Sequence, residues 1–224
     1  MAGPGVEAAV GDRAFGALVK RNAETGLIEP RGDLAAVDED LVATVAHDIA
    51  RHAQHPLAEE LRAFPEMHFD ELARRLARSV PAQQRSTIAH GDFRTDNVVY
   101  DAGDPRRINA VLDWELSTLG DPLTDVGLLM LFWRSADESQ LSLIPGITHL
   151  PGFPERDVML ERYAAASGAD LSDMGFYRAF AHFKFAVIAQ GVQARAAAGA
   201  MGGQDFGNLD DEILELAQVG LQHI

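Results

Sequence analysis

The side chains best suited to chemistry lie in two short segments, residues 90–97 and 112–115. The first segment contains Asp92 and, five positions later, Asn97, and the second contains Asp113. Phosphoryl transfer needs one group that orients and deprotonates a hydroxyl, and two oxygen ligands that hold Mg²⁺ against ATP. Two carboxylates and a side-chain amide could supply these groups. The two segments are therefore the first candidates for a functional site.

The elements expected around these side chains form a strand–loop–strand unit. Short β-branched runs predict strands at 87–89, 98–100 and 108–112. A loop between the first two would bring Asp92 and Asn97 toward one ion, and a hairpin would place Asp113 beside Asn97. The alternative is that Asp92, Asp96 and Asn97 only form turns, as Asp and Asn often do. The spacing, the strand that follows and the later Asp-Trp-Glu together favour the functional interpretation.

Most of the remaining sequence has a helical pattern. Apolar periodicity predicts helices at about 38–53, 66–79, 155–167, 173–198 and 209–221. Asp121 is expected to cap a further helix, with Pro122 at its first position and an apolar run to Trp133. Residues 134–154 contain several prolines and glycines and predict a long loop, where functional residues are often found.

Composition excludes several classes of function. The 224 residues carry a net charge of −15, so the chain lacks the basic surface that nucleic-acid binding requires. The sequence contains no cysteine, which rules out disulfides and thiolate metal sites. It shows neither a signal-peptide pattern nor a run long enough to span a bilayer, so the expected location is the cytoplasm, without nucleic acid or membrane as partner.

The segments 90–97, 112–115 and 120–125 together resemble the aminoglycoside phosphotransferase/choline-kinase-like family of small-molecule kinases. Within that family, residues 90–191 are most similar to phosphotransferases related to the kinase domain attached to some acyl-CoA dehydrogenases. Segments 151–173 and 176–195 support this narrower match. The resemblance covers about residues 66–221. It implies an α+β, mainly α fold: a protein-kinase-like C-lobe, which is a helical lobe with a small catalytic β-hairpin.

The resemblance also implies roles for individual residues. Asp92 would be the catalytic base, and Asn97 and Asp113 would bind Mg²⁺ and, through it, the co-substrate ATP. His90 would hold the catalytic loop through hydrogen bonds. Asp125 would accept hydrogen bonds from the backbone of that loop, although a first-turn acid is also favoured by the helix dipole alone.

Arg94 and Glu115 are less determined. The guanidinium of Arg94 could stabilise the transferring phosphate, and pairing with Asp96 or Asp125 is equally consistent with the sequence. Glu115 is interpreted as structural rather than as a metal ligand.

Two motif matches are rejected as kinase elements. The tripeptide 205–207 reads Asp-Phe-Gly, but it lies several helices after the catalytic loop, whereas Asp113 has the expected context. Glycines at 11 and 16 lie too close to Lys20 for a phosphate loop and an ATP-binding lysine on consecutive strands. Lys184, the only other lysine, lies in a C-terminal helix and is judged to be misplaced for that role.

The sequence before His90 lacks a series of strands and a well-placed lysine, so the N-lobe is expected to be absent or reduced. We divide the chain into residues 1–60, an atypical arm of unknown role, and 61–224, the kinase-like lobe. A partner chain that supplies an N-lobe is a further expectation.

Three functions stay open at this point. The first is an ATP- and Mg²⁺-dependent phosphotransferase acting on a hydroxyl of a hydroxyacyl-CoA, an amino sugar or a small alcohol, and not necessarily active alone. The second is a non-catalytic kinase-like binding module. The third is a Mg²⁺-dependent phosphate hydrolase.

Overall fold

The computed structural model describes residues 66–104, 107–197, 199, 207 and 209–224. Its helices are α3 (Glu66–Arg78), α4 (Leu123–Phe132), α5 (Arg156–Ser167), α6 (Met174–Ala197) and α7 (Asp210–Gln222), and its strands are β1 (Thr87–Ala89), β2 (Val98–Tyr100), β3 (Ile108–Val111) and β4 (Thr118–Gly120). These helices match the expected ones to within about two residues at each end. The helix expected at 38–53, the arm 1–60 and the question of the N-lobe lie outside the described residues.

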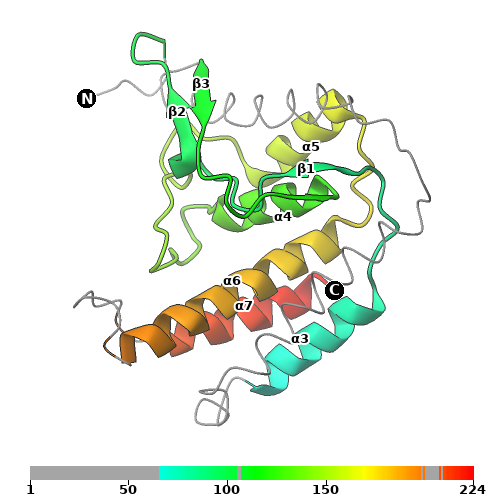
Figure 1. Cartoon of the computed structure of the whole chain (residues 1–224), viewed down its shortest axis with the longest axis vertical. Coiled ribbons are helices and arrows are strands. Elements are labelled where there is room, and N and C mark those ends of the chain that lie inside the picture. The colour runs from blue at the N-terminus through cyan, green and yellow to red at the C-terminus, as the bar shows by residue number, and fades with distance from the viewer. Residues whose placement is uncertain (1–65, 105–106, 198, 200–206, 208) are drawn as a thin grey trace.

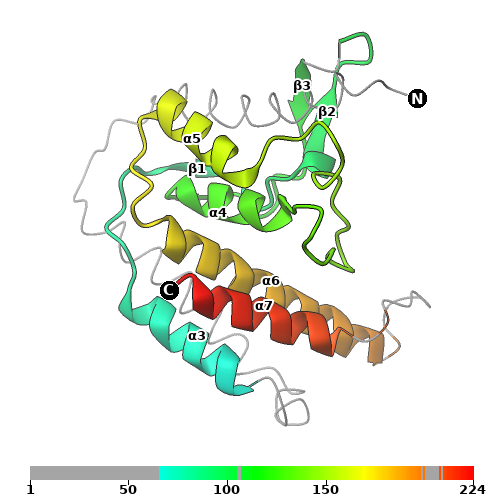
Figure 2. The same ribbon diagram turned by 180° about the vertical axis from the view of Figure 1, so that it is seen from behind.

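The helices form two groups around the long helix α6. Helices α3 and α7 pack beside α6 as a layer, and α4 packs against α6 from the other side (Figures 1 and 2). The β2–β3 hairpin projects on the α4 side, away from the α3–α7 layer (Figures 1 and 2). The segment that begins at residue 90 contacts α4 through Asp125 and α6 through Lys184.

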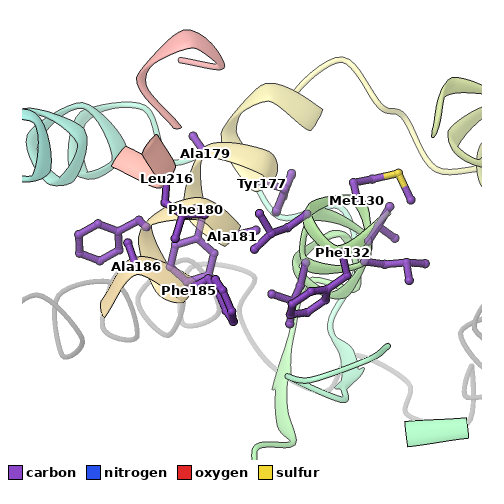
Figure 3. Close-up of a cluster of buried hydrophobic side chains, with 14 of the residues drawn as sticks. Met130, Phe132, Tyr177, Ala179, Phe180, Ala181, Phe185, Ala186 and Leu216 are labelled. Carbon is purple, nitrogen blue, oxygen red and sulfur yellow. The ribbon is translucent and has the colours of Figure 1, made fainter. Parts of the chain in front are cut away.

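The apolar core lies along α6, which is packed between α4 on one side and α7 on the other (Figure 3). The rings of Phe132 in α4 and Phe185 in α6 meet edge to face, with their centroids 5.4 Å apart. Tyr177 of α6 and Leu216 of α7 are also buried. Burial of each such side chain contributes about 1.5–3 kcal/mol to folding, so this contact fixes the position of α4.

A close backbone contact sets the distance between α4 and α6. A side chain at Gly127 would overlap the backbone carbonyl of Tyr177, so only glycine allows the two helices to approach this closely. Asp121, just before α4, is fully buried, and its carboxylate accepts hydrogen bonds from the N–H of Leu123 (2.9 Å) and the hydroxyl of Tyr177 (3.1 Å). The helix itself begins at Leu123, so Pro122 and not Asp121 is its N-cap residue, one position later than expected.

The strands form two separate antiparallel ribbons. In one ribbon β2 pairs with β3, with Val98 opposite Val111, and in the other β1 pairs with β4, with Ile88 opposite Leu119. The sequence did not predict β4, because its three residues are too few to show a period and one is glycine. The chain thus leaves β1, forms the catalytic loop and the β2–β3 hairpin, and returns to β1.

The segment between α4 and α5 forms neither helix nor strand, as expected for 134–154. Among the described helices, none has the combination of length and apolar character needed to cross a bilayer.

Candidate active site

Two connecting segments run side by side between the ribbons: residues 90–97, which follow β1, and residues 112–117, which follow β3. Hydrogen bonds join them, because the N–H of Leu112 donates to the carbonyl of Asn97 (2.8 Å). Gly91 has φ +82°, and a side chain there would overlap the carbonyl of Leu116. The close approach of the two segments therefore requires glycine at this position.

The ring of His90 links the two segments. It is buried, and its Nε2 lies 2.7 Å from the carbonyl oxygen of Leu112, while the N–H of Asp92 donates to its Nδ1 at 3.2 Å. A carbonyl only accepts hydrogen bonds, so Nε2 carries the proton and Nδ1 is the acceptor. The indole of Trp114 packs against the imidazole, with centroids 4.6 Å apart. Both ring nitrogens of His90 are therefore used in hydrogen bonds to backbone groups of the two segments.

Asp125 supports the loop from the first turn of α4. Its carboxylate is buried and accepts the backbone N–H groups of His90 (2.6 Å) and Gly91 (2.8 Å). Burial raises the pKa of the Asp125 carboxyl above its ordinary value, and these two hydrogen bonds oppose the increase. Hydrogen bonds of the kind expected for Asp125 are therefore present.

Asp92 lies at the partly exposed end of this loop. Its Oδ2 accepts hydrogen bonds from Nδ2 of Asn97 (3.0 Å) and Nε of Arg94 (3.3 Å), and Asn97 also donates to the Asp92 backbone carbonyl (2.8 Å). No described residue donates to Oδ1 of Asp92 or to Oδ1 of Asn97. The amide nitrogen of Asn97 therefore fixes the Asp92 side chain, while one oxygen of each residue stays available.

Arg94 forms ion pairs with acids of its own loop. Its Nη1 donates to Asp96 at 2.7 Å in addition to the contact with Asp92. Its guanidinium also lies 6.0 Å from the ring centroid of Phe132, a cation–π distance. Of the partners considered from the sequence, the structure selects Asp96, and it shows no ion pair between Arg94 and Asp125.

Asp113 follows the hairpin and is exposed to solvent. Because Leu112 hydrogen-bonds to the Asn97 carbonyl, the backbone of Asp113 begins next to Asn97, as the expected hairpin requires. Asp113 has φ 63°, the only positive value for a residue other than glycine in the described part of the chain. Strained backbone of this kind is common in ligand-binding residues. Glu115 lies in the following turn and is exposed.

The oxygen atoms of Asn97 and Asp113 suit a hard cation that also binds water or phosphate oxygens. No group of three or more His, Cys, Asp and Glu side chains in the described residues is arranged to hold a metal by itself. Mg²⁺, however, usually takes only one or two protein carboxylates and completes its shell with water and phosphate oxygens. The carboxylate of Asp113 and the unbonded amide oxygen of Asn97 fit that pattern.

A small hollow opens beside the loop. It is lined by residues 94–96 of the catalytic loop, by 129, 132 and 133 at the end of α4, and by 144–148 of the long irregular segment, and its volume of about 10 Å³ is close to the space of a single water molecule. The long loop therefore reaches the site, as its composition suggested.

Sequence reasoning missed one contact with this loop. Lys184 was judged misplaced, yet its Nζ donates to the backbone carbonyl of Gly91 at 2.9 Å. The sequence around Lys184 gave no indication of this contact. Its partner is a backbone carbonyl, which every residue has, so no residue type marks the partner in the sequence. The rejected matches at 11–20 and at 205–206 lie outside the described residues.

The sequence profile of the phosphotransferase enzyme family matches residues 8–180, more than half of the chain. The chain belongs to this phosphotransferase family. The match begins before the region of about 66–221 where we placed the resemblance, and it contains every candidate site residue from His90 to Asp125.

Curated relatives of this family member include acyl-CoA dehydrogenase family member 11 of Mus musculus, 36% identical over 159 residues, which are 68% of this chain and 20% of the relative. Acyl-CoA dehydrogenase family member 10 of Mus musculus is 36% identical over 169 residues, covering 71% of this chain and 15% of the relative. The chain therefore spans about a fifth or less of the length of these relatives.

A solved structure supports the fold. A crystal structure described as a candidate aminoglycoside phosphotransferase of Ralstonia eutropha superposes with a TM-score of 0.73 over 99% of this chain and 66% of that chain. The sequence identity is 23%, so the likeness concerns the fold. This phosphotransferase family member thus has the kinase-like fold, with helices and small sheets, that its motifs predicted.

Proposed function

We propose that this chain transfers the terminal phosphoryl group of ATP to a hydroxyl group of a small molecule, with Asp92 as the general base. The observation that carries the proposal is the geometry around Asp92. Its Oδ2 is held by Asn97, while no described residue donates to its Oδ1, and Asp113 lies two residues after the end of β3, the strand that pairs with β2. Family membership supports a phosphotransferase, and this geometry supports the assignment of roles.

Asp92 orients the acceptor and receives its proton. The acceptor hydroxyl donates to Oδ1 of Asp92, its oxygen attacks the γ-phosphorus, and the bond from phosphorus to the β–γ bridging oxygen breaks. The proton moves to Asp92 and ADP leaves with the bond electrons. The hydrogen bonds of Asn97 to Asp92 keep the carboxylate at a fixed angle, which favours in-line attack.

Asn97 and Asp113 are the residues that would bind Mg²⁺, through the amide oxygen and the carboxylate respectively. When bound, Mg²⁺ neutralises negative charge on the phosphate oxygens. Arg94 contributes a further positive charge at the edge of the hollow, and its pairing with Asp96 sets its direction. A guanidinium in this position would stabilise charge on the transferring phosphoryl group.

The acceptor would approach Asp92 along the surface beside residues 94–96, with the long loop next to it. The names of the curated relatives favour a hydroxyacyl-CoA, and that of the solved structure favours an amino sugar. Small alcohols are the third candidate class. The walls from α4 and from 144–148 are partly apolar, which suits an acyl chain better than a polycationic sugar.

A non-catalytic binding module is a second candidate function, because the described residues offer no free lysine for the phosphates of ATP. Lys184, the one lysine in the described part of the chain, donates to Gly91, so the described residues offer no lysine for the triphosphate. A clamp on ATP would then come from residues outside the described part or from a partner chain that supplies an N-lobe. Without one, the fold would serve as a non-catalytic binding module.

Calorimetric titration with Mg²⁺-ATP tests the proposal. We expect binding to the wild type and its loss in Asp113→Ala, followed by ADP formation with one of the three acceptor classes. Heat at millimolar nucleotide without turnover of any acceptor would favour the binding module. Release of phosphate from a simple ester, lost in Asp92→Ala, would favour the hydrolase. No heat with either protein would contradict autonomous kinase activity.

A further inference from the structure

Lys184 reaches the catalytic loop from the middle of α6. Its Nζ donates to the carbonyl oxygen of Gly91 at 2.9 Å, a contact between residues 93 positions apart. The side chain is only partly exposed, although its neighbours Phe183 and Phe185 are buried core residues. The hydrogen bond is partly buried, so it is less exposed to competition from water than a contact on the open surface.

The peptide unit that Lys184 contacts leads directly into Asp92. The carbonyl of Gly91 and the N–H of Asp92 belong to the same planar group. Lys184 holds the carbonyl end, and Nδ1 of His90 accepts the N–H end at 3.2 Å. Both ends of this peptide plane are therefore fixed, and with them the direction in which the Asp92 side chain leaves the backbone.

Asp125 holds the two preceding peptide units. Its carboxylate accepts the N–H groups of His90 and Gly91, so the three successive N–H groups of residues 90–92 all have partners. Burial raises the pKa of Asp125, and the positive charge of Lys184 is among the effects that oppose this increase. Lys184 therefore also favours the charged form of the carboxylate that anchors the loop.

We propose that Lys184 is a positioning residue for Asp92: its ammonium group fixes the Gly91–Asp92 peptide plane and so aims the Asp92 carboxylate at the acceptor. This inference rests on the proposed function of Asp92. An apolar side chain of similar length would fill the same space but would release the peptide plane. Such a substitution therefore removes the charge and the hydrogen bond of Lys184 while its packing is kept.

The test compares Lys184→Met, Lys184→Arg and the control Arg195→Met, which removes an exposed cation from the same helix. The assay is Mg²⁺-ATP turnover with water as the acceptor. We expect kcat to fall about 10- to 100-fold in Lys184→Met with the KM for ATP unchanged, because a small misplacement of a catalytic group has effects of this size. Lys184→Arg should recover much of kcat, and Arg195→Met should match the wild type.

Amide hydrogen exchange supplies a second measurement that does not depend on turnover. In Lys184→Met, exchange at Gly91 and Asp92 should accelerate, while amides in the α6–α7 core stay protected. Unchanged exchange at these two amides, or an unchanged kcat per folded molecule, would overturn the proposal. Wild type that neither binds nor turns over Mg²⁺-ATP would instead contradict the proposed function, and the exchange rates would then decide the positioning role alone.

Discussion

At the scale of single residues, Asp113 has a left-handed backbone conformation (φ 63°), which lowers the free energy of unfolding. Glycine adopts this conformation without that steric penalty. The exposed side chain of Asp113 makes no hydrogen bond within the described residues that would offset this cost. The strained position instead places a carboxylate next to Asn97, where the proposed function requires a Mg²⁺ ligand. Stability and ligand binding are therefore expected to respond in opposite directions to the same substitution.

Asp113→Gly and Asp113→Ala form a matched pair that tests this. Both remove the carboxylate, so both should lose Mg²⁺-dependent ATP binding by calorimetry. Only Gly accepts the left-handed backbone, so Asp113→Gly should be more stable than Asp113→Ala by about 1 kcal/mol in urea unfolding. A higher stability of Asp113→Ala than of Asp113→Gly would show that this backbone conformation carries no strain, because alanine then keeps its advantage in unfolded-chain entropy.

Asp92→Asn isolates the role of Asp92 as a base. The amide oxygen can still accept the hydrogen bond from Asn97, so the loop should keep its geometry while the proton acceptor is lost. We expect kcat to fall about 10²- to 10⁴-fold with little change in the KM for ATP. Asp137→Asn, which changes an exposed acid, serves as the control. Retention of full turnover by Asp92→Asn would exclude Asp92 as the base.

At the scale of elements, Arg156 joins the start of α5 to the end of α4. Its guanidinium donates to the carbonyls of Met130 (3.1 Å) and Trp133 (2.6 Å), which lack partners within the helix, and to Glu138 (2.7 Å). Burial alone would raise the pKa of Glu138, but hydrogen bonds from Arg156 and Ser135 lower it to about 2. These contacts of Arg156 fix the end of α4, which lines the hollow beside residues 94–96.

Arg156→Met should therefore destabilise the fold by roughly 2–3 kcal/mol, because it leaves the carbonyls of Met130 and Trp133 without their donor and removes the ion pair with Glu138. Urea unfolding measures the loss. Arg156→Lys keeps the charge but cannot reach all three partners, so it should fall between Met and wild type. A loss below about 0.5 kcal/mol in Arg156→Met would show that water replaces these contacts.

The sequence predicted the parts of the site that depend on local pattern. The strands β1 to β3, the helix lengths and the hairpin that leads to Asp113 follow from side-chain periodicity and turn residues. The contact between Lys184 and Gly91 could not be predicted, because it joins a side chain to a backbone group 93 positions away. The ribbon partner β4 was missed for a related reason: its pairing with β1, and not its composition, makes it a strand.

At the scale of the whole molecule, two histidines make stability depend on pH. His182 of α6 and His223 after α7 lie with ring centroids 5.2 Å apart. Burial lowers the pKa of His182 from 6.5 to about 3 and that of His223 from 6.5 to about 4. Both rings are therefore neutral in the folded chain at pH values where the unfolded chain is protonated.

Stability should accordingly fall as the pH decreases from about 6.5 toward about 4. Urea unfolding across this range measures the slope, and His223→Gln should reduce it. Glu138 acts in the same direction only below its ordinary value of 4.5. The raised pKa values of Asp121 and Asp125 act in the opposite direction, since their protonated forms are favoured by folding. An unchanged slope in His223→Gln would contradict burial of the neutral His223 ring.

This chain corresponds to only part of the proteins that it resembles. The curated relatives are several times longer than this chain, and the matched structure also extends beyond it. A substrate or partner of those longer proteins therefore has to be tested on this chain directly. The residues His90 to Asp125 are the part of the proposal that such tests can address one side chain at a time.

The hydrogen bonds that hold the loop before Asp92 have a consequence for the order of folding. They connect residues 22, 34, 35 and 93 positions apart, whereas α6 and α7 each form from local contacts. Closing long loops is slow because chain entropy is lost before the contact forms. During refolding, helical structure should therefore precede the arrangement of Asp92, and recovered activity should report the last step rather than the first.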